Sequence, residues 1–559
     1  MLELAGAVVP LQREGRRVIG ARVGLDGRWC VEALNWEVRD LSRFTPLAIG
    51  QDRVEHALDA RYRELGGRIY RGARFTGVKE AGRDGTHVDV ERFIYIRPPK
   101  QTPDVPASLR QVAATTFHAK FVVGCDGKQS AVRKALGINF AGKEYPQGFY
   151  LADVEFDEQE VCAKGWSGHT LHAVLAQSRF ILLVHMQGQV WRAYIAGSDI
   201  NADSTVESIK SFWKEFVPDP GVPRPLSFRD PGYFHVSCKL IERYRVGRCL
   251  LAGDAAHCHS PAGGQGMNTG LQDAANLAWK LAAVLQGKAT EELLDSYEAE
   301  RKPIAEWVLR TSDGAFASVT TTSSVLSSVR NFMMKYVVSR VPGSGIPPMS
   351  VRNKMFGLTH SYAQAGTCVN SGPTARAGAI SAGDRLPDFT CQMEGGSPTS
   401  LLQLLCRDRL ALHLLFLGPE PVHWQLLDPL LRKLEEACAW PFHVWSLATS
   451  SSCRTEGMPP DRQIHSCSAP VQALSSTGDL EAALRLRAGE RAVLVVRPDG
   501  YVAIALRDAS AQPGPLAAEM QAALAACNLA PARVGSGDLQ ARGVFGRALH
   551  RLGSRCCGA

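Results

Sequence analysis

The stretch that decides the fold runs from residue 253 to residue 287 and reads GDAAHCHSPAGGQGMNTGLQDAANLAWKLAAVLQG. A short apolar run at residues 249–252 precedes it and has the composition of a buried strand. Inside it, Gly263, Gly264 and Gly266 form a glycine-rich turn, after which apolar residues recur at helical spacing. Closely spaced glycines let backbone N–H groups approach a ligand at a helix N-terminus. The stretch therefore predicts a strand-turn-helix cradle for a ligand.

Asp254 indicates what that ligand is. An acidic residue at the end of a strand can accept hydrogen bonds from ligand hydroxyls, so the cradle suits a polyol joined to a flat, electron-poor ring. The block also resembles the second FAD fingerprint of the class A flavoprotein aromatic monooxygenases, the p-hydroxybenzoate hydroxylase superfamily. Its variant HCHSPAGGQGMN is most similar to the phenol 2-monooxygenase branch.

The resemblance implies roles for individual residues. Asp254 would contact the ribityl hydroxyls, Met267 and Asn268 the pyrimidine edge, and Pro261 would lie beside the reacting face of the ring. Outside the block, the run FHAKFVVGCDG at residues 117–127 resembles the family's DG motif near the FAD pyrophosphate and the path of NADPH. The implied cofactor-binding residues are Gln51, Asp126, Gly127, Gly253, Asp254, Pro261, Gly263, Gly264, Gly266, Met267 and Asn268.

Two of these residues have a second interpretation. Asp126 precedes the helix-forming run SAVRKAL and can equally be a helix cap or a turn residue. Gln51 matches a glutamine of the family near the nucleotide, but it also suits the start of a helix over residues 51–65, which a strand should follow.

A dinucleotide-binding unit normally opens with a strand, GxGxxG and a helix whose N-terminus holds the pyrophosphate. No GxGxxG occurs in this sequence. We therefore expect the FAD-binding domain to be N-terminally incomplete, through an annotation artefact, a short isoform or true loss. Several charge-assisted hydrogen bonds worth roughly 1.5 to 3 kcal/mol each would then be missing, and FAD would bind poorly.

The expected fold class is α/β: a glutathione-reductase-like FAD-binding domain with an inserted antiparallel substrate-binding sheet, plus a C-terminal thioredoxin-like domain. The latter follows from a β-α-β-β-α order, in which residues 491–506 are expected to form one strand, and from a match of RPDG at residues 497–500 to phenol hydroxylases. It contains no CxxC and so does not suggest dithiol exchange. Within the helix expected over residues 293–309, Arg301 should brace helices and not touch the ligand. The expected boundaries are 1–145 and 246–365 for the FAD-binding domain, 146–245 for the sheet, 366–384 for a linker, 385–530 for the C-terminal domain and 531–559 for a flexible tail.

The composition narrows the class of protein. A net charge of +8 over 559 residues, with no dense basic tract, does not indicate nucleic-acid binding. The 15 cysteines are scattered without a CxxC pair, which favours a reducing, cytoplasmic location over a disulfide scaffold. No metal site is expected at His257, Cys258 and His259, because neighbouring side chains of an extended segment point to opposite sides. Neither a signal peptide nor an integral membrane segment is expected.

The resemblance implies an activity as well. The expected enzyme is an FAD-dependent monooxygenase that consumes NADPH or NADH and dioxygen and hydroxylates a phenolic or other small aromatic compound through a flavin C4a-hydroperoxide. A base or hydrogen-bond relay should activate the phenol; the weak candidates are His172, His185, Tyr194 and His235. The C-terminal domain is expected to have a structural role or to form a homodimer. The alternative is a truncated or degenerate paralogue that acts as a non-catalytic binding or scaffold protein.

Overall fold

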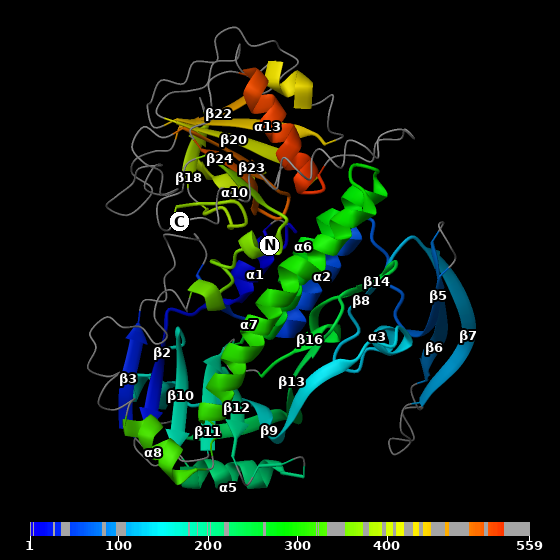
Figure 1. Ribbon diagram of the computed structural model, residues 1–559. Coiled ribbons are helices and arrows are strands. Elements are labelled where there is room, and N and C mark those ends of the chain that lie inside the picture. Colours follow the sequence, from blue (N-terminus) through cyan, green and yellow to red (C-terminus); the bar gives the residue numbers. More distant parts are fainter. Residues whose placement is uncertain are drawn as a thin grey trace.

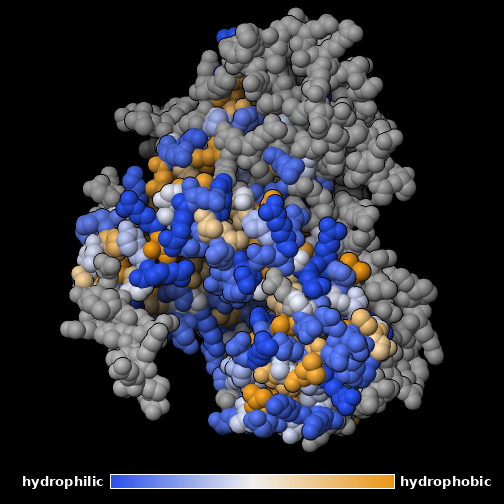
Figure 2. Space-filling view, turned by 180° about the vertical axis from the view of Figure 1, so that it is seen from behind, coloured by the Kyte–Doolittle hydropathy of each residue, from blue (hydrophilic) through white to orange (hydrophobic). Residues whose placement is uncertain are grey.

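The computed structural model has a mixed α/β fold, as the sequence predicted (Figure 1). It describes residues 2–3, 5–25, 28–34, 45–80, 85–96, 108–176, 179–186, 188–197, 200–201, 203–216, 223–260, 264–319, 321, 323–332, 353–372, 379–388, 390–393, 398–405, 410–418, 429–434, 440–448, 464–468, 491–507 and 513–529. Among the described residues, no helix is long and apolar enough to cross a membrane. Figure 2 shows that the described part of the back face is mostly hydrophilic, with scattered hydrophobic residues.

A large sheet, called the middle sheet below, forms the lower part of the molecule (Figure 1). Its neighbouring strands are antiparallel except for the parallel pair β10 and β2. The strand order is β16 (His257–Cys258), β13 (Pro225–Ile241), β9 (Phe140–Phe156), β12 (Val190–Ala196), β11 (Arg179–His185), β10 (Thr170–Ala176), β2 (Gly20–Leu25) and β3 (Arg28–Leu34). The sheet therefore extends beyond the expected range of 146–245: it includes two N-terminal strands and, at its edge, a strand from the 253–287 stretch.

Each face of the middle sheet is covered by a helix. Period-2 burial along β12 places Trp191, Ala193 and Ile195 on one face, where α5 (Val206–Phe216) packs with its apolar side. On the opposite face, Phe316 of α7 (Asp295–Val319) packs against Phe149. Short helices flank the strands: α4 (Glu158–Ala163) follows β9, and α8 (Ser324–Phe332) follows α7.

A second, small sheet carries the elements on which the 253–287 stretch depends. β15 (Cys249–Leu251) pairs in parallel with β8 (Val122–Gly124), and β14 (Arg245–Val246) pairs with β15 from the other side. The expected strand at 249–252 is thus β15, and the expected helix is α6 (Gly266–Leu285). α3 (Ala131–Ala135) follows β8. All three residues of β15 are buried because it lies between two strands and against α6 and α7.

The remaining N-terminal elements surround this sheet. They are α1 (Val8–Glu14), the strand pair β1 (Arg16–Arg17) and β4 (Leu47–Ala48), α2 (Gln51–Glu64), and a three-stranded ribbon of β5 (Ala73–Glu80), β6 (Thr86–Ile96) and β7 (Ser108–Ala119). The helix expected at 51–65 and the strand expected after it are both present.

The C-terminal sheet forms a separate layer at the top of the molecule (Figure 1). Its order is β17 (Val369–Ser371), β24 (Val502–Arg507), β23 (Ala492–Val496), β20 (Leu412–Gly418), β21 (Phe442–Ala448), β22 (Ile464–Ser468), β18 (Thr390–Met393) and β19 (Pro398–Ser400). Its helices include α10 (Leu401–Leu405) and α13 (Pro513–Ala526).

Two sequence expectations differ from this sheet. Residues 491–506 were expected to form one strand, but they form a hairpin, because Gly500 turns the chain back with a positive φ of 81°. Part of the expected linker at 366–384 is β17, which pairs in parallel with β24. The expected tail at 531–559 lies outside the described residues.

The C-terminal sheet rests on α6. Trp279 and Ala283 of α6 share one buried cluster with Leu412 and Leu414 of β20 and with Met520 of α13. The opposite side of α6 contributes Leu277 to the cluster around β15. α6 is therefore a shared wall between the small sheet and the C-terminal sheet.

Candidate functional site

The site lies where β8 and β15 end. The register Leu251↔Gly124 brings the carboxyl ends of the two strands to the same edge, so the turns that carry Asp126 and Asp254 leave the sheet side by side. Gly124 is required for this approach, because a Cβ there would lie 2.7 Å from Leu251 Cδ2. The sheet therefore brings together the two acidic turns that the sequence singled out.

Asp126 caps α3. One of its oxygens accepts a hydrogen bond from Ser130 Oγ at 2.5 Å, and the other accepts from the backbone N–H of Ala131 at 2.6 Å and of Val132 at 3.2 Å. Both oxygens thus have partners in the chain itself and help to cap α3, whose N-cap residue is Ser130. Its neighbour Gly127 has a φ of +78°, which glycine adopts without strain. Direct contact of Asp126 with a cofactor stays a prediction.

Asp254 differs from Asp126 in its surroundings. It lies on a short 3-10 turn, its side chain is exposed, and no hydrogen bond from a described residue reaches its carboxylate. Gly253 before it has a φ of +59°, and a Cβ at this position would lie 3.7 Å from the Cα of Gly270 on α6. The positive φ of Gly253 suits glycine, and the Asp254 carboxylate that follows it is open toward solvent.

A buried carboxylate that sequence reasoning missed holds the turn in place. Asp273 of α6 is 1% exposed and accepts hydrogen bonds from Gly253 N (3.0 Å), His257 Nε2 (2.6 Å) and Arg301 Nε (2.7 Å). Burial by itself raises the pKa of Asp273, but the charges and hydrogen bonds of His257 and Arg301 lower it to about 2. Asp273 is therefore ionised at neutral pH and ties the strand, the turn and two helices together.

Arg301 has the bracing role that the sequence predicted. Its side chain is fully buried between α6 and α7, and besides Asp273 it donates to Thr269 O at 3.3 Å and to Tyr362 Oη at 3.4 Å. The sequence suggested no partner for it, because Asp273 lies within an otherwise apolar helical run.

A second missed residue joins the two acidic turns. Arg133 of α3 is buried and donates to Ala255 O at 3.0 Å and to Lys128 O at 2.8 Å. Its guanidinium also lies 4.0 Å from the centre of the Phe140 ring. Only the fold brings residues 122 positions apart into this contact.

The N-terminus of α6 presents free polar groups beside this turn. α6 begins at Gly266, and the side chain of its N-cap residue Gln265 makes no capping hydrogen bond. Gln265 is buried, and its Oε1 has no hydrogen-bond partner among the described residues; the same holds for His259 Nε2. Gly266 leaves room here, since a Cβ would lie 3.7 Å from the His259 ring.

The other predicted residues of the 253–268 loop lie around this helix end. Gly264 has a φ of +62°, and its carbonyl accepts a hydrogen bond from Asn268 Nδ2 at 3.3 Å. Asn268 and Met267 are exposed. Two predicted residues, Pro261 and Gly263, lie outside the described residues.

These groups suit the ring and polyol part of FAD. The first N–H groups of a helix lack intrahelical partners and carry partial positive charge, so they attract electron-rich atoms at the edge of a flat ring. The unpartnered Gln265 Oε1 can accept a hydrogen bond from a ring N–H, and the Asp254 carboxylate can accept bonds from hydroxyls. Gln51 does not join this group among the described contacts. It is the first residue of α2, it is exposed, and its side chain donates to Glu55 at 2.9 Å.

The four candidate bases lie in different places. His172 is buried and stacks on Trp166 at 4.1 Å, and His185 stacks on Trp191 at 4.5 Å. Both tryptophans belong to the cluster on the α5 side of the middle sheet. Burial lowers the pKa of His172 to about 4 and also lowers that of His185. Both histidines therefore lie on the α5 side of the middle sheet, and a role of either as the base stays a prediction.

The other two candidates are Tyr194 and His235. Tyr194 packs against the cluster that contains Phe149 and Phe316, on the α7 side of the sheet. Burial raises the pKa of its phenol, so it stays protonated at neutral pH. His235 of β13 is exposed and packs edge-on to Tyr233 at 5.2 Å. Only Tyr194 among the four therefore combines partial burial with a position on the face that α7 covers.

The 253–268 loop and the middle sheet are directly connected. Cys258 and His257 form β16, which pairs with Lys239 and Leu240 of β13. The 253–268 loop is thus hydrogen-bonded to the middle sheet through β16 and β13. Burial raises the pKa of the Cys258 thiol to about 12, so it stays protonated at neutral pH.

The chain was compared with known proteins. Residues 20–312 match the family model described as an FAD binding domain. A 12-dehydrotetracycline 5-monooxygenase/anhydrotetracycline 6-monooxygenase of Streptomyces rimosus is 36% identical over 272 residues, which are 47% of this chain and 50% of that protein. Pentachlorophenol 4-monooxygenase of Sphingobium chlorophenolicum is 30% identical over 285 residues, 50% of this chain and 49% of that protein. The chain thus spans about half the length of the curated relatives it matches.

Solved structures match over more of the chain. The anhydrotetracycline hydroxylase OxyS from Streptomyces rimosus is 25% identical with a TM-score of 0.64, and the match covers 95% of this chain and 89% of that one. The flavin-dependent monooxygenase PieE, solved in complex with FAD and substrate, is 17% identical with a TM-score of 0.70 over 94% of this chain and 90% of that one. At that identity, the second likeness is one of fold.

Proposed function

Because the chain belongs to the FAD-binding-domain family of class A aromatic monooxygenases, we propose that it is an FAD-dependent monooxygenase of a phenolic or other aromatic compound. Its co-substrates in this proposal are dioxygen and NADPH or NADH. The observation that carries the proposal is the open Asp254 carboxylate beside the unsatisfied N-terminus of α6. None of the observations favours the non-catalytic scaffold alternative.

FAD would be held by its ring and ribityl parts. Asp254 would accept hydrogen bonds from the ribityl hydroxyls, and Gln265 Oε1 would accept one from a ring N–H. The N–H groups at the start of α6, from Gly266 to Asn268, would stabilise negative charge on the pyrimidine edge. When bound, FAD supplies the redox chemistry with NAD(P)H and dioxygen that ordinary side chains lack.

The aromatic substrate would lie on the α7 side of the middle sheet. Phe149 of β9, Phe234 of β13 and Tyr194 of β12 belong to one cluster on that face, and aromatic rings pack well against one another in offset or edge-on arrangements. Since Tyr194 stays protonated, its role would be to donate a hydrogen bond that orients the substrate, and not to remove a proton. The middle sheet would also exclude water from the reacting atoms.

A flavin titration tests the proposal. Asp254→Asn removes a charge-assisted acceptor worth roughly 1.5 to 3 kcal/mol, so we expect the FAD dissociation constant to rise about tenfold or more. Asp203→Asn, at an exposed turn before α5, is the matched control and should leave it unchanged. Titrating riboflavin in parallel measures how much of the binding comes from the ring and ribityl parts.

Activity is measured separately, as NADPH or NADH oxidation and product formation on a panel of phenols. Substrate-dependent oxidation with hydroxylated product would support the proposal. Equal FAD affinity of the wild-type protein and of Asp254→Asn would show that the 253–268 loop is not the flavin site.

A further inference from the structure

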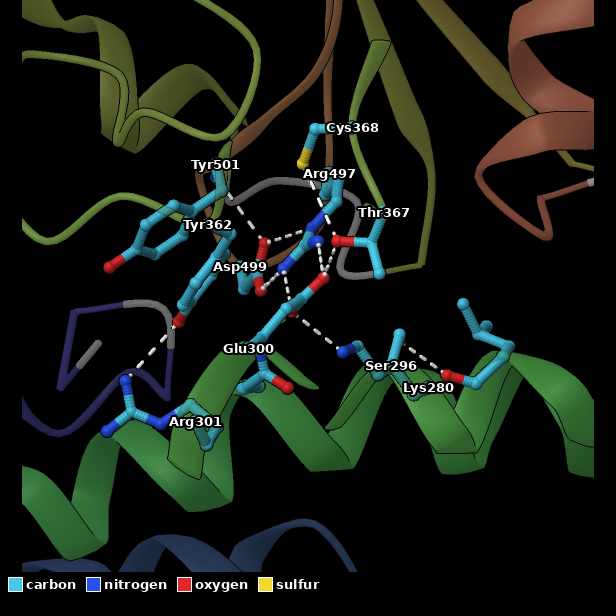
Figure 3. A network of polar contacts seen from close by, with 12 residues as sticks. Lys280, Ser296, Glu300, Arg301, Tyr362, Thr367, Cys368, Arg497, Asp499 and Tyr501 are labelled. Carbon is cyan, nitrogen blue, oxygen red and sulfur yellow. Dashed lines mark hydrogen bonds and ion pairs between the residues drawn. The ribbon is translucent and has the colours of Figure 1, made fainter. Parts of the chain in front are cut away.

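A buried polar network connects the C-terminal sheet to the candidate site, and Figure 3 shows the part of it around Glu300 and Arg301. The charged side chains in it are all 7% exposed or less. They are Asp273 and Lys280 of α6, Glu300 and Arg301 of α7, and Arg497 and Asp499 of the β23–β24 turn. Buried charges are costly unless they are paired. Each of these side chains therefore needs its partners in place in the folded protein.

Glu300 is the point at which the C-terminal sheet enters the network. Arg497 binds it with two parallel bonds, Nη1 to Oε1 at 2.6 Å and Nη2 to Oε2 at 3.0 Å. The same carboxylate accepts from Lys280 Nζ at 2.8 Å, Asn276 Nδ2 at 2.7 Å and Thr367 Oγ1 at 2.7 Å. A bidentate arginine fixes the plane of a carboxylate as well as its position. Glu300, and the turn of α7 that carries it, are therefore held in one orientation.

Arg497 is itself held in place. Asp499, two residues later in the RPDG turn, accepts from its Nε at 3.0 Å and from its Nη2 at 2.5 Å. Its guanidinium lies 5.1 Å from the Trp279 ring and 5.2 Å from the Tyr362 ring. The conformation of the RPDG turn thus determines where the guanidinium meets α7.

The next residue of α7 continues the connection toward the candidate site. Arg301 binds Asp273, and Asp273 binds the N–H of Gly253 and the ring of His257. A parallel link runs through Tyr362, which accepts from Arg301 and stacks at 4.1 Å on Tyr501, the residue after the RPDG turn. The contacts from Arg497 to Glu300 and from Arg301 to Asp273 are buried, and the last one, from Gly253 N to Asp273, is partly buried.

We propose that Arg497 is a positioning residue for the 253–268 loop: by fixing Glu300 it sets the α7 turn that aims Arg301 at Asp273, which holds Gly253 and His257. This inference rests on the proposed function in that the loop is taken to bind flavin. The C-terminal sheet then acts on the flavin-binding turn from a distance, without contributing a residue to it. If Arg497 only held the C-terminal sheet against α7, replacing it would leave the 253–268 loop unaffected.

The test measures hydrogen-deuterium exchange of the full chain, wild type against Arg497→Lys, in peptides that cover residues 252–259. Lysine at a bidentate site keeps the charge but loses the fork geometry, so Arg497→Lys should weaken the hold on Glu300 without leaving it unpaired. We expect exchange in these peptides to become about fivefold faster or more, since the Gly253 N–H opens more often. Peptides from β11 and β12 should keep their wild-type rates.

Two control measurements exclude a general effect. Lys288→Met removes a different contact between the same two parts, the 3.5 Å bond from Lys288 Nζ to Leu410 O, and should leave residues 252–259 unchanged. In an Arg301→Lys background, adding Arg497→Lys should change the exchange by less than about twofold, because effects transmitted through a shared residue do not add. Thr367→Val, which removes one bond to Glu300, is a milder probe and should accelerate exchange about twofold.

The flavin readout separates this proposal from the proposed function. The FAD dissociation constant of Arg497→Lys should rise about fivefold together with the faster exchange. If Asp254→Asn weakens FAD binding but Arg497→Lys leaves exchange at residues 252–259 unchanged, the positioning role is wrong and the flavin site stands. If exchange accelerates while Asp254→Asn has no effect on FAD, the positioning stands and the flavin assignment fails. Equal acceleration in every peptide would also overturn the positioning role, because it would show global destabilisation.

Discussion

Asp273→Asn is the most informative single substitution in this protein. The change keeps the size of the side chain but removes its charge and replaces one acceptor oxygen with a donor nitrogen. All three partners of Asp273 present donors to it: Gly253 N, His257 Nε2 and Arg301 Nε. Whichever way the amide is turned, its nitrogen meets another donor. Arg301, which is fully buried, also loses its carboxylate partner.

The size of the effect follows from two independent considerations. A fall in the pKa of Asp273 from 3.8 to about 2 corresponds to about 2 kcal/mol in favour of the ionised form. Removing one partner of a buried ion pair costs about 3 to 5 kcal/mol, because the other charge is left uncompensated. We therefore expect Asp273→Asn to lower the free energy of unfolding by about 2 to 5 kcal/mol at pH 7.

Urea denaturation followed by tryptophan fluorescence measures this change. Asp295→Asn is the matched control, since Asp295 pairs with Arg245 at the surface with 69% of its side chain exposed, and its loss should cost less than about 1 kcal/mol. Because the folded pKa of Asp273 is depressed, its contribution is complete above about pH 4 and is lost as the pH falls toward 2. The difference between wild type and Asp273→Asn should shrink over that range. A loss below 1 kcal/mol at pH 7 would refute the assignment of Asp273 as the central acceptor.

Three further substitutions test other parts of the fold. The folded pKa of His172, about 4, lies below its ordinary value of 6.5, so the unfolded chain binds a proton between these values and stability falls as the pH drops from 6.5 to 4. In urea titrations, the free energy of unfolding of the wild type should fall by up to about 3 kcal/mol over this range, and His172→Gln should remove that fall. Gly253→Ala should cost roughly 1 to 2 kcal/mol in thermal denaturation, because alanine is strained at a φ of +59°. Gly314→Ala, in α7 with open space around it, should stabilise the protein by about 0.5 to 1 kcal/mol; a loss of stability there would contradict the open surroundings.

Local patterns predicted the site's framework well. The strand at 249–252, the glycine turn and the helix after it follow one another in sequence, so composition and spacing were sufficient to find them. The fold shows the oxygens of Asp126 bonded to the start of α3, while its contact with a cofactor stays a prediction. The bracing role of Arg301 was also foreseen, although its partner was not.

What the sequence did not reveal depends on contacts between distant residues. Asp273 lies 16 residues from His257 and 28 from Arg301, and nothing in its local run distinguishes it from a surface residue. The two faces of the middle sheet could not be assigned, because a shift of register by one residue exchanges them. For that reason His172 and Tyr194 looked equivalent as candidates, while the fold places them on opposite faces.

The shared wall formed by α6 has a consequence for where the chain can be divided. Trp279 and Ala283 of α6, together with Leu293, belong to the same buried cluster as the core of the C-terminal sheet. Cutting the chain near residue 366 would therefore expose a continuous apolar surface and leave Glu300 without Arg497. We expect such a fragment to aggregate, although residues 366–384, where it would end, have the composition of a linker. The part before residue 366 and the C-terminal sheet share one core, so we expect a shortened version to fold only if it keeps both.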